Sequence, residues 1–193
     1  IGAVAINEIH YHPAQGEAEF VELKNLTDAA VPLYDPANPT NGWRLDGVGC
    51  TFPPGSTLAP QALAVVVGGD PAAFRARYQV PAGVVVFGPY SGALQDGGER
   101  LRLQRPDAPT IDGGGLSVPY LTVDEVAYDN RAPWPVESDG AGASLERIKP
   151  NTYGNDPANW RASFDVPSPG LPNDGNRMPK VAAGPDQTLV AAL

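Results

Sequence analysis

The stretch RLRLQ, residues 100–104, alternates apolar and polar side chains at every position. Successive side chains of a β-strand point to opposite faces of the sheet. The pattern therefore predicts a strand with Leu101 and Leu103 facing a core and the other side chains facing water. The stretch LAVVV, residues 63–67, is apolar throughout, which predicts a strand covered on both faces. Together the two stretches indicate a protein built from packed sheets.

Similar short runs, separated by turn-forming residues, recur along the chain. Eight strands at this spacing predict an all-β sandwich or barrel. The expected strands cover residues 3–11, 18–25, 42–46, 63–67, 84–87, 100–104, 122–128 and 144–148. One short helix is expected at residues 70–78, where Asp70 suits the N-cap and Pro71 the first helical position.

The composition is that of a folded, turn-rich chain. Its 193 residues include 22 glycines and 22 prolines, while 42% are hydrophobic, which is enough for a core. Acidic side chains outnumber basic ones by 22 to 13, for a net charge of -9. Nucleic acids and anionic membrane surfaces are bound through Lys and Arg, so neither is an expected partner. Membrane insertion is not expected either, because no apolar run approaches the ~20 residues of a spanning helix.

We expect the chain to be one part of a longer protein. It begins directly with a strand pattern and carries no signal peptide. The single cysteine, Cys50, has no partner for an internal disulfide and is expected to be a small, partly buried hydrophobe. The last turn-rich cluster ends near residue 175. We therefore predict one domain over residues 1–175, and over residues 176–193 a linker with the first strand of a following domain.

A series of motifs in a fixed order resembles that of bacterial lamin-tail domains. The motifs are INEI (6–9), EFVELKN (19–25), GWRL (42–45), FPPG (52–55), GERLRL (98–103), VDEVAY (123–128), WP (134–135), SLER (144–147), NW (159–160) and SPGLPN (168–173). Their order carries the resemblance, which spans most of residues 3–174. It implies an all-β, immunoglobulin-like β-sandwich that is usually non-catalytic and serves as an accessory module of exported bacterial enzymes and surface proteins.

The segment AGPDQT, residues 183–188, is similar to the start of the PKD-like, immunoglobulin-like repeats of secreted bacterial proteins. This second resemblance implies an extracellular or cell-surface location for a multidomain parent. The expected partners are neighbouring domains of the same chain and a cell-surface polymer or protein, and the module is expected to be a monomer. Compared with animal lamin tails, residues 34–41 and 106–121 form longer insertions. Loops on a rigid sandwich commonly carry binding, so these two are the expected contact segments.

The nucleophiles and glycine-rich segments of the chain carry none of the common catalytic motifs. No serine lies in a Gly-x-Ser-x-Gly motif, and the two histidines, His10 and His12, are neighbours in sequence, so no triad is indicated. No Gly-x-x-x-x-Gly-Lys loop is present to hold a phosphate. The main prediction is therefore a non-catalytic interaction or spacer module without a cofactor.

A metal-dependent hydrolase is the first alternative. Glu8, His10 and His12 occupy every second position, so in a strand they project from one face, and all three side chains can ligate zinc. Glu19 and Glu22 are expected on the adjacent strand. Calcium, held by glutamate oxygens and loop carbonyls, is the other ion that this set suits.

A carbohydrate-binding module is the second alternative. Trp43, Trp134 and Trp160 would form a platform for sugar rings if they reached one surface. Each also lies in a motif of the lamin-tail framework, so packing in the core or at the sandwich edge is the competing interpretation. Arg147, next to Glu146, is expected to form a partly buried ion pair that fixes the edge of the sandwich.

Overall fold

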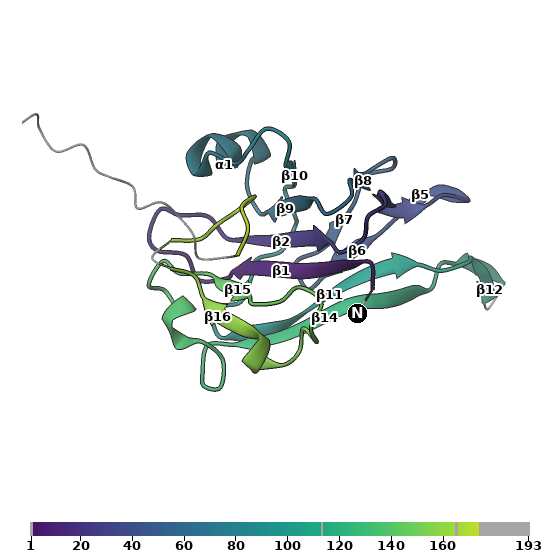
Figure 1. Cartoon of the computed structure of the whole chain (residues 1–193). Coiled ribbons are helices and arrows are strands. Elements are labelled where there is room, and N and C mark those ends of the chain that lie inside the picture. The colour runs from purple at the N-terminus through teal and green to yellow at the C-terminus, as the bar shows by residue number, and fades with distance from the viewer. Residues whose placement is uncertain (1, 113, 165, 174–193) are drawn as a thin grey trace, which may run out of the picture.

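A computed structural model describes residues 2–112, 114–164 and 166–173, and two sheets face each other across one core (Figure 1). The first sheet contains β1 (Val4–His10), β2 (Phe20–Asn25), β9 (Leu63–Val67), β10 (Val85–Phe87), β15 (Leu145–Arg147) and β16 (Trp160–Ala162). The second contains β6 (Arg44–Asp46), β7 (Cys50–Thr51), β11 (Gly98–Pro106) and β14 (Tyr120–Asp129). Their strand orders are β10-β9-β2-β1-β15-β16 and β14-β11-β6-β7. The prediction of an all-β sandwich is confirmed.

Both expected contact segments contain short hairpins rather than irregular loops. Three two-stranded sheets flank the sandwich: β3 (Val31–Pro32) with β8 (Thr57–Leu58), β4 (Tyr34–Asp35) with β5 (Asn38–Gly42), and β12 (Thr110–Asp112) with β13 (Gly115–Ser117). The β12–β13 hairpin projects beyond the sandwich at the end of the β11–β14 ribbon (Figure 1). Two short 3-10 helices, η1 (Val136–Ser138) and η2 (Pro157–Asn159), lie near the C-terminal strands.

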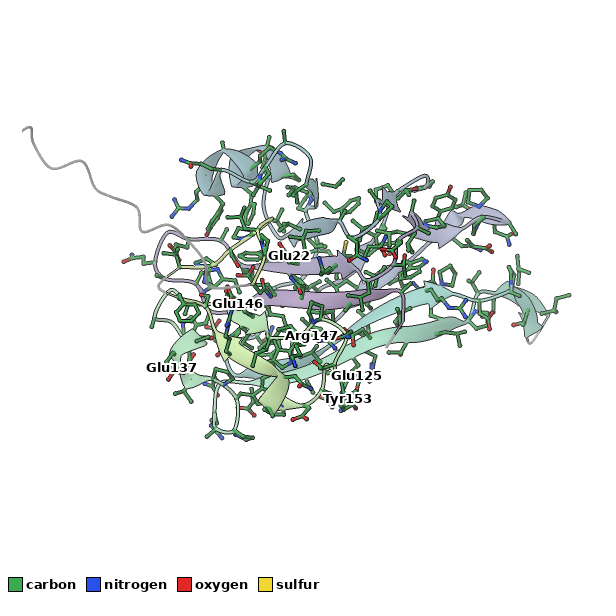
Figure 2. All side chains as sticks on the ribbon, in the orientation of Figure 1. Glu22, Glu125, Glu137, Glu146, Arg147 and Tyr153 are labelled. Carbon is green, nitrogen blue, oxygen red and sulfur yellow. The ribbon has the colours of Figure 1, made fainter. Side chains whose placement is uncertain are left out.

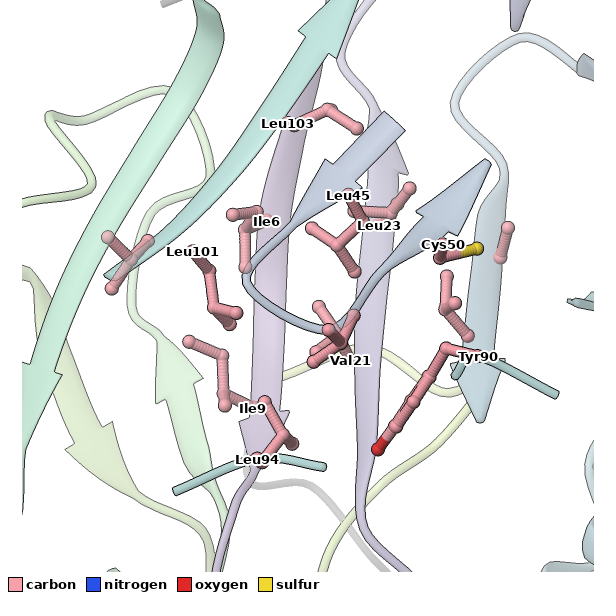
Figure 3. Close-up of a cluster of buried hydrophobic side chains, with 14 of the residues drawn as sticks. Ile6, Ile9, Val21, Leu23, Leu45, Cys50, Tyr90, Leu94, Leu101 and Leu103 are labelled. Carbon is pink, nitrogen blue, oxygen red and sulfur yellow. The ribbon is translucent and has the colours of Figure 1, made fainter. Parts of the chain in front are cut away.

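The core lies between the inner faces of the two sheets (Figure 3). As predicted, Leu101 and Leu103 of β11 are fully buried, while Arg100, which precedes Leu101, is exposed. Burying a side chain of this size contributes about 1.5–3 kcal/mol relative to leaving it in water. The side chains that face each other across the sandwich include Ile6, Ile9, Val21 and Leu23 from the first sheet and Leu45, Leu101 and Leu103 from the second.

Strand β9 is covered on both faces, as its sequence predicts. Ala64 and Val66 belong to the main core, whereas Val65 and Val67 pack with Phe74 of helix α1 (Pro71–Tyr78) in a second cluster. The helix connects β9 to β10, and these two strands run parallel. A parallel pair needs a crossover connection instead of a tight hairpin, and α1 supplies it. The single expected helix is therefore confirmed, and its role as a crossover is an addition from the structure.

Helix α1 ends in a backbone conformation that favours glycine. Gln79, its C-cap, has φ 53° and ψ 38°, in the left-handed region, and its N–H donates to the carbonyl of Arg75. We expect Gln79→Gly to raise the free energy of unfolding by up to about 1 kcal/mol, because glycine adopts this conformation without steric cost. Urea unfolding measures the change. The control, Ala73→Gly inside the helix, should destabilise by about 0.5–1 kcal/mol, and a loss of stability in Gln79→Gly would contradict the prediction.

The predicted linker and start of a following domain, residues 176–193, lie outside the described residues, so this boundary stays a prediction. Among the described residues, no helix combines the length and the apolar character that crossing a membrane requires.

Candidate functional site

Three glutamates lie together on the outer face of the first sheet. Glu22 stands between the core residues Val21 and Leu23 and therefore points away from the core. Glu8 lies opposite Glu22 in the β1–β2 ladder and opposite Glu146 in the β1–β15 ladder. All three carboxyl groups are buried, although the outer face of a sheet in a sandwich ordinarily meets water. Another segment of the chain must therefore cover these three carboxyl groups.

The cover is the closing segment, residues 166–173, which crosses the ends of β1 and β2 (Figure 1). The Ser168 N–H donates to Glu8 Oε1 at 2.8 Å, and the Gly170 N–H donates to Glu22 Oε2 at 2.6 Å. Asn173 Nδ2 donates to the carbonyl of Asn7 at 2.8 Å. Backbone and side-chain donors of the closing segment thus satisfy the buried carboxyl groups and hold this segment against the sheet.

The Ser168 hydroxyl indicates that one carboxyl group carries a proton. Its Oγ lies 3.0 Å from Glu8 Oε2 and 2.9 Å from Glu146 Oε1. A hydroxyl has one proton, so two full hydrogen bonds form here only if Glu8 is protonated and donates to the Ser168 oxygen. Burial raises the pKa of Glu8 to about 7, and burial together with the charge of Glu8 raises the pKa of Glu22 well above its ordinary value. A protonated glutamate in this cluster near neutral pH agrees with the geometry.

The other three predicted metal ligands are placed differently. His10 shares the outer face, where its ring packs edge-on against Phe20, and burial lowers its pKa to about 4. Strand β1 ends at His10, so the two-residue alternation does not continue to His12. His12 instead pairs through Nδ1 with Asp139 Oδ1 at 2.6 Å. Glu19 Oε2 accepts a hydrogen bond from the Leu94 N–H at 2.5 Å.

The predicted metal centre is therefore not assembled. In the part of the chain that the structure describes, no three His, Cys, Asp or Glu side chains are placed to hold an ion. Glu8 and Glu22 are engaged by the closing segment, while His12 and Glu19 lie at the end of the sandwich. Alternation along one strand predicted a shared face, but it did not predict what would cover that face.

The three tryptophans are packing residues. Trp43, Trp134 and Trp160 are only 7%, 7% and 4% exposed. The rings of Trp134 and Trp160 lie 6.1 Å apart, and the Trp160 indole N–H donates to the Gly154 carbonyl at 2.7 Å. They form no exposed platform for sugar rings, which the carbohydrate-binding alternative required of these positions. The competing interpretation, packing in the core and at the sandwich edge, holds.

Arg147 forms an ion pair, but with Asp124 rather than with the expected Glu146. Consecutive side chains of a strand point to opposite faces, so Glu146 faces outward to Arg161 while Arg147 faces inward. Arg147 is fully buried, and its Nη1 lies 2.5 Å from Asp124 Oδ2 and 2.8 Å from the Ile6 carbonyl. Asp124 also accepts from the Ile6 N–H at 2.9 Å. The pair therefore joins β1, β14 and β15 inside the sandwich.

Sequence reasoning missed a cavity of about 580 Å³ at the end of the sandwich where β1 and β9 stop and β2 starts. Five short segments line it, at residues 11–13, 17–19, 68–69, 92–94 and 96. No motif or spacing signals such a site, because its walls come together only when the strands pair. The only hint in the sequence is the presence of polar residues just beyond two strand ends.

These features define the class of the protein. It is an immunoglobulin-like β-sandwich module. Its buried polar cluster holds the closing segment against the first sheet, and its buried ion pair joins the two sheets. The sequence model of the family described as Lamin Tail Domain matches residues 1–115, more than half of the chain, and the protein belongs to this family. The match ends in the β12–β13 hairpin, whereas β14, β15, β16 and the closing segment complete the sandwich. None of the curated proteins and none of the solved structures compared with the chain matches it.

Proposed function

We propose that this protein is a non-catalytic interaction module of an exported, multidomain bacterial protein, and that it docks on a cell-surface protein through the tip of the β12–β13 hairpin. The observation that carries this proposal is a pair of exposed apolar side chains. Ile111 and Leu116 are 82% and 77% exposed and lie directly opposite each other in the hairpin. Single exposed apolar residues are ordinary, whereas adjacent ones on a projecting element are typical of interaction sites.

The rest of the molecule supports the same role. The membership in the lamin-tail family implies a non-catalytic module, and the resemblance of residues 183–188 to repeats of secreted proteins favours a multidomain, extracellular setting. The Asn173 side chain donates to the carbonyls of Asn7 and Arg147, so the last described residue is held against β1 and β15. Such an attachment suits a module that holds its neighbours at a set position.

The proposal is tested by retention of the full chain on bacterial cell envelopes. We expect retention on envelopes, loss of retention after the envelopes are treated with protease, and none on insoluble polysaccharides or DNA. The double variant Ile111→Ser/Leu116→Ser should reduce retention at least ~10-fold without changing the melting temperature, because both side chains are exposed.

The matched control is Val136→Ser, which removes an apolar side chain that is 50% exposed on another element. This variant should be retained like the unaltered chain. Retention that survives the hairpin substitutions would refute the hairpin as the docking site. Retention on polysaccharide, or on nothing, would refute a protein partner and leave the spacer role.

A further inference from the structure

The cavity at the end of the sandwich is strongly acidic. Three carboxylates line it, from Glu17, Glu19 and Asp96. His12 is the one basic side chain of its lining among the described residues, and it is already engaged with Asp139 at 2.6 Å, with Asp96 Oδ2 at 3.8 Å from its other ring nitrogen. A carboxylate-lined hollow of this kind attracts cationic groups.

Two buried polar atoms at this cavity lack a hydrogen-bond partner within the described ranges. The side chain of Tyr11 is almost completely buried, at 1% exposure, and its hydroxyl bonds to nothing. The ring packs against that of Tyr128, with centroids 4.7 Å apart, and burial, followed by the charges of Asp139, Asp129 and Asp96, raises the pKa of the Tyr11 hydroxyl. Buried polar atoms in native proteins are nearly always paired, so this hydroxyl indicates a missing partner.

Glu17 supplies the second unpartnered atom. Its Oε2 is buried and bonds to none of the described residues, although the side chain also lines the cavity. A carboxylate oxygen is an acceptor only, so the group that satisfies it must be a donor. The side chains of Tyr11 and Glu17 both line the acidic hollow, and their unpartnered hydroxyl and carboxylate oxygen match one donor group with a positive charge.

The size and lining of the cavity favour an organic cation over a metal ion. Its volume of about 580 Å³ falls within the range of about 300–1,000 Å³ that is typical of small-molecule sites. Pro13, Ala18 and Leu94 provide apolar walls, which suit the methylene stem of an amine. No three potential metal ligands converge among residues that the structure describes.

We propose that this cavity binds an alkylammonium group, with the ammonium donating to Tyr11 and Glu17 and its methylenes packing on Leu94. The chemistry fits both a lysine side chain presented by a protein and a free amine. The site lies at the end of the sandwich where β11 begins, away from the β12–β13 tip where β11 ends, and it does not depend on the docking role proposed above.

The test is an NMR titration of the full chain in which the backbone amides of Gly92 and Leu94 are followed. Nα-acetyl-lysine methylamide should give saturable shifts, whereas the norleucine analogue, which lacks the ammonium group, should give none. n-Butylamine, the second arm, distinguishes the two sources. Equal affinity of both amines supports a site for the ammonium alone, and tighter binding of the lysine compound supports a peptide ligand. Calcium chloride is the third arm, and shifts with calcium but not with either amine would overturn the proposal.

Variants locate the site. Glu17→Gln/Asp96→Asn should weaken binding about 10-fold or more, since it removes two charged acceptors. Tyr11→Phe should weaken binding several-fold and leave the melting temperature unchanged, because the hydroxyl that it removes bonds to none of the described residues. Asp107→Asn, an exposed carboxylate at the other end of β11, should bind like the unaltered chain. Unchanged affinity in both cavity variants, or no saturable shift with the lysine compound, would refute the site.

Discussion

Arg147→Ala is expected to lower the free energy of unfolding by about 3–5 kcal/mol, because it leaves the buried carboxylate of Asp124 without its counter-charge. Both side chains are nearly inaccessible, at 0% and 2% exposure. The guanidinium also donates to the carbonyls of Ile6 and Thr152, so its removal takes a donor away from two further segments. Urea unfolding at constant pH measures the loss, and a melting temperature far below that of the unaltered chain should accompany it.

Arg100→Ala is the matched control. Arg100 and Glu125 both lie in the second sheet and pair at 2.6 Å, but the Arg100 side chain is 50% exposed. Exposed pairs contribute about 0–1 kcal/mol, so the control should change stability little. A loss in Arg147→Ala no larger than that of the control would show that the buried pair does not hold the two sheets together.

We expect the change that Glu8→Gln causes in the free energy of unfolding to be more favourable at pH 8 than at pH 5. The difference between the two pH values should be on the order of 3 kcal/mol. Burial raises the pKa of Glu8 to about 7 in the folded chain, from an ordinary value of 4.5. The folded state therefore binds this proton more tightly than the unfolded state. The stability that the proton provides is complete below about pH 4.5 and is lost as the pH rises through 7. Glutamine resembles the protonated acid and does not titrate, so the variant escapes this loss.

His10 acts in the opposite direction, because burial lowers its pKa from 6.5 to about 4, and the fold loses stability as the pH falls below 6.5. It is present in both proteins, so the comparison of Glu8→Gln with the unaltered chain cancels its effect. Unfolding free energies of both proteins at pH 5 and pH 8 give the result. Glu137→Gln, at an exposed position of η1 (Figure 2), controls for the change in net charge. Parallel pH profiles for Glu8→Gln and the unaltered chain would refute a strongly raised pKa at Glu8.

The closing segment binds the buried glutamates across a long separation in sequence. Ser168 and Glu8 are 160 positions apart in sequence, yet two hydrogen bonds join them. The last described segment of the chain therefore covers Glu8 and Glu22, which lie on the first two strands. Residues 1–115, which the family match covers, hold Glu8 and Glu22 but neither Glu146 nor the segment that buries them.

Local patterns predicted the main strands of the two sheets and the faces they present. They did not predict the short strands β3, β4, β5, β7, β8, β12, β13 and β16. The alternation at residues 100–104 predicted which side chains of β11 enter the core, and the apolar run at 63–67 predicted a strand covered on both sides. Asp70 and Pro71 marked the start of α1, where Asp70 caps the amide groups of the first turn. These features depend on neighbours in sequence, because strand and helix geometry repeats every few residues.

Only the tertiary structure decided what each face meets. Alternation along the strands placed Glu8 and Glu22 on the outer face but did not reveal that residues 166–173 bury them. Adjacency in sequence suggested Glu146 as the partner of Arg147, whereas the structure pairs Arg147 with Asp124. The sequence by itself therefore determined an all-β sandwich with one short helix. The pairing of the buried charges, the burial of the tryptophans and the cavity at the sandwich end depended on contacts between distant segments, which no local period encodes.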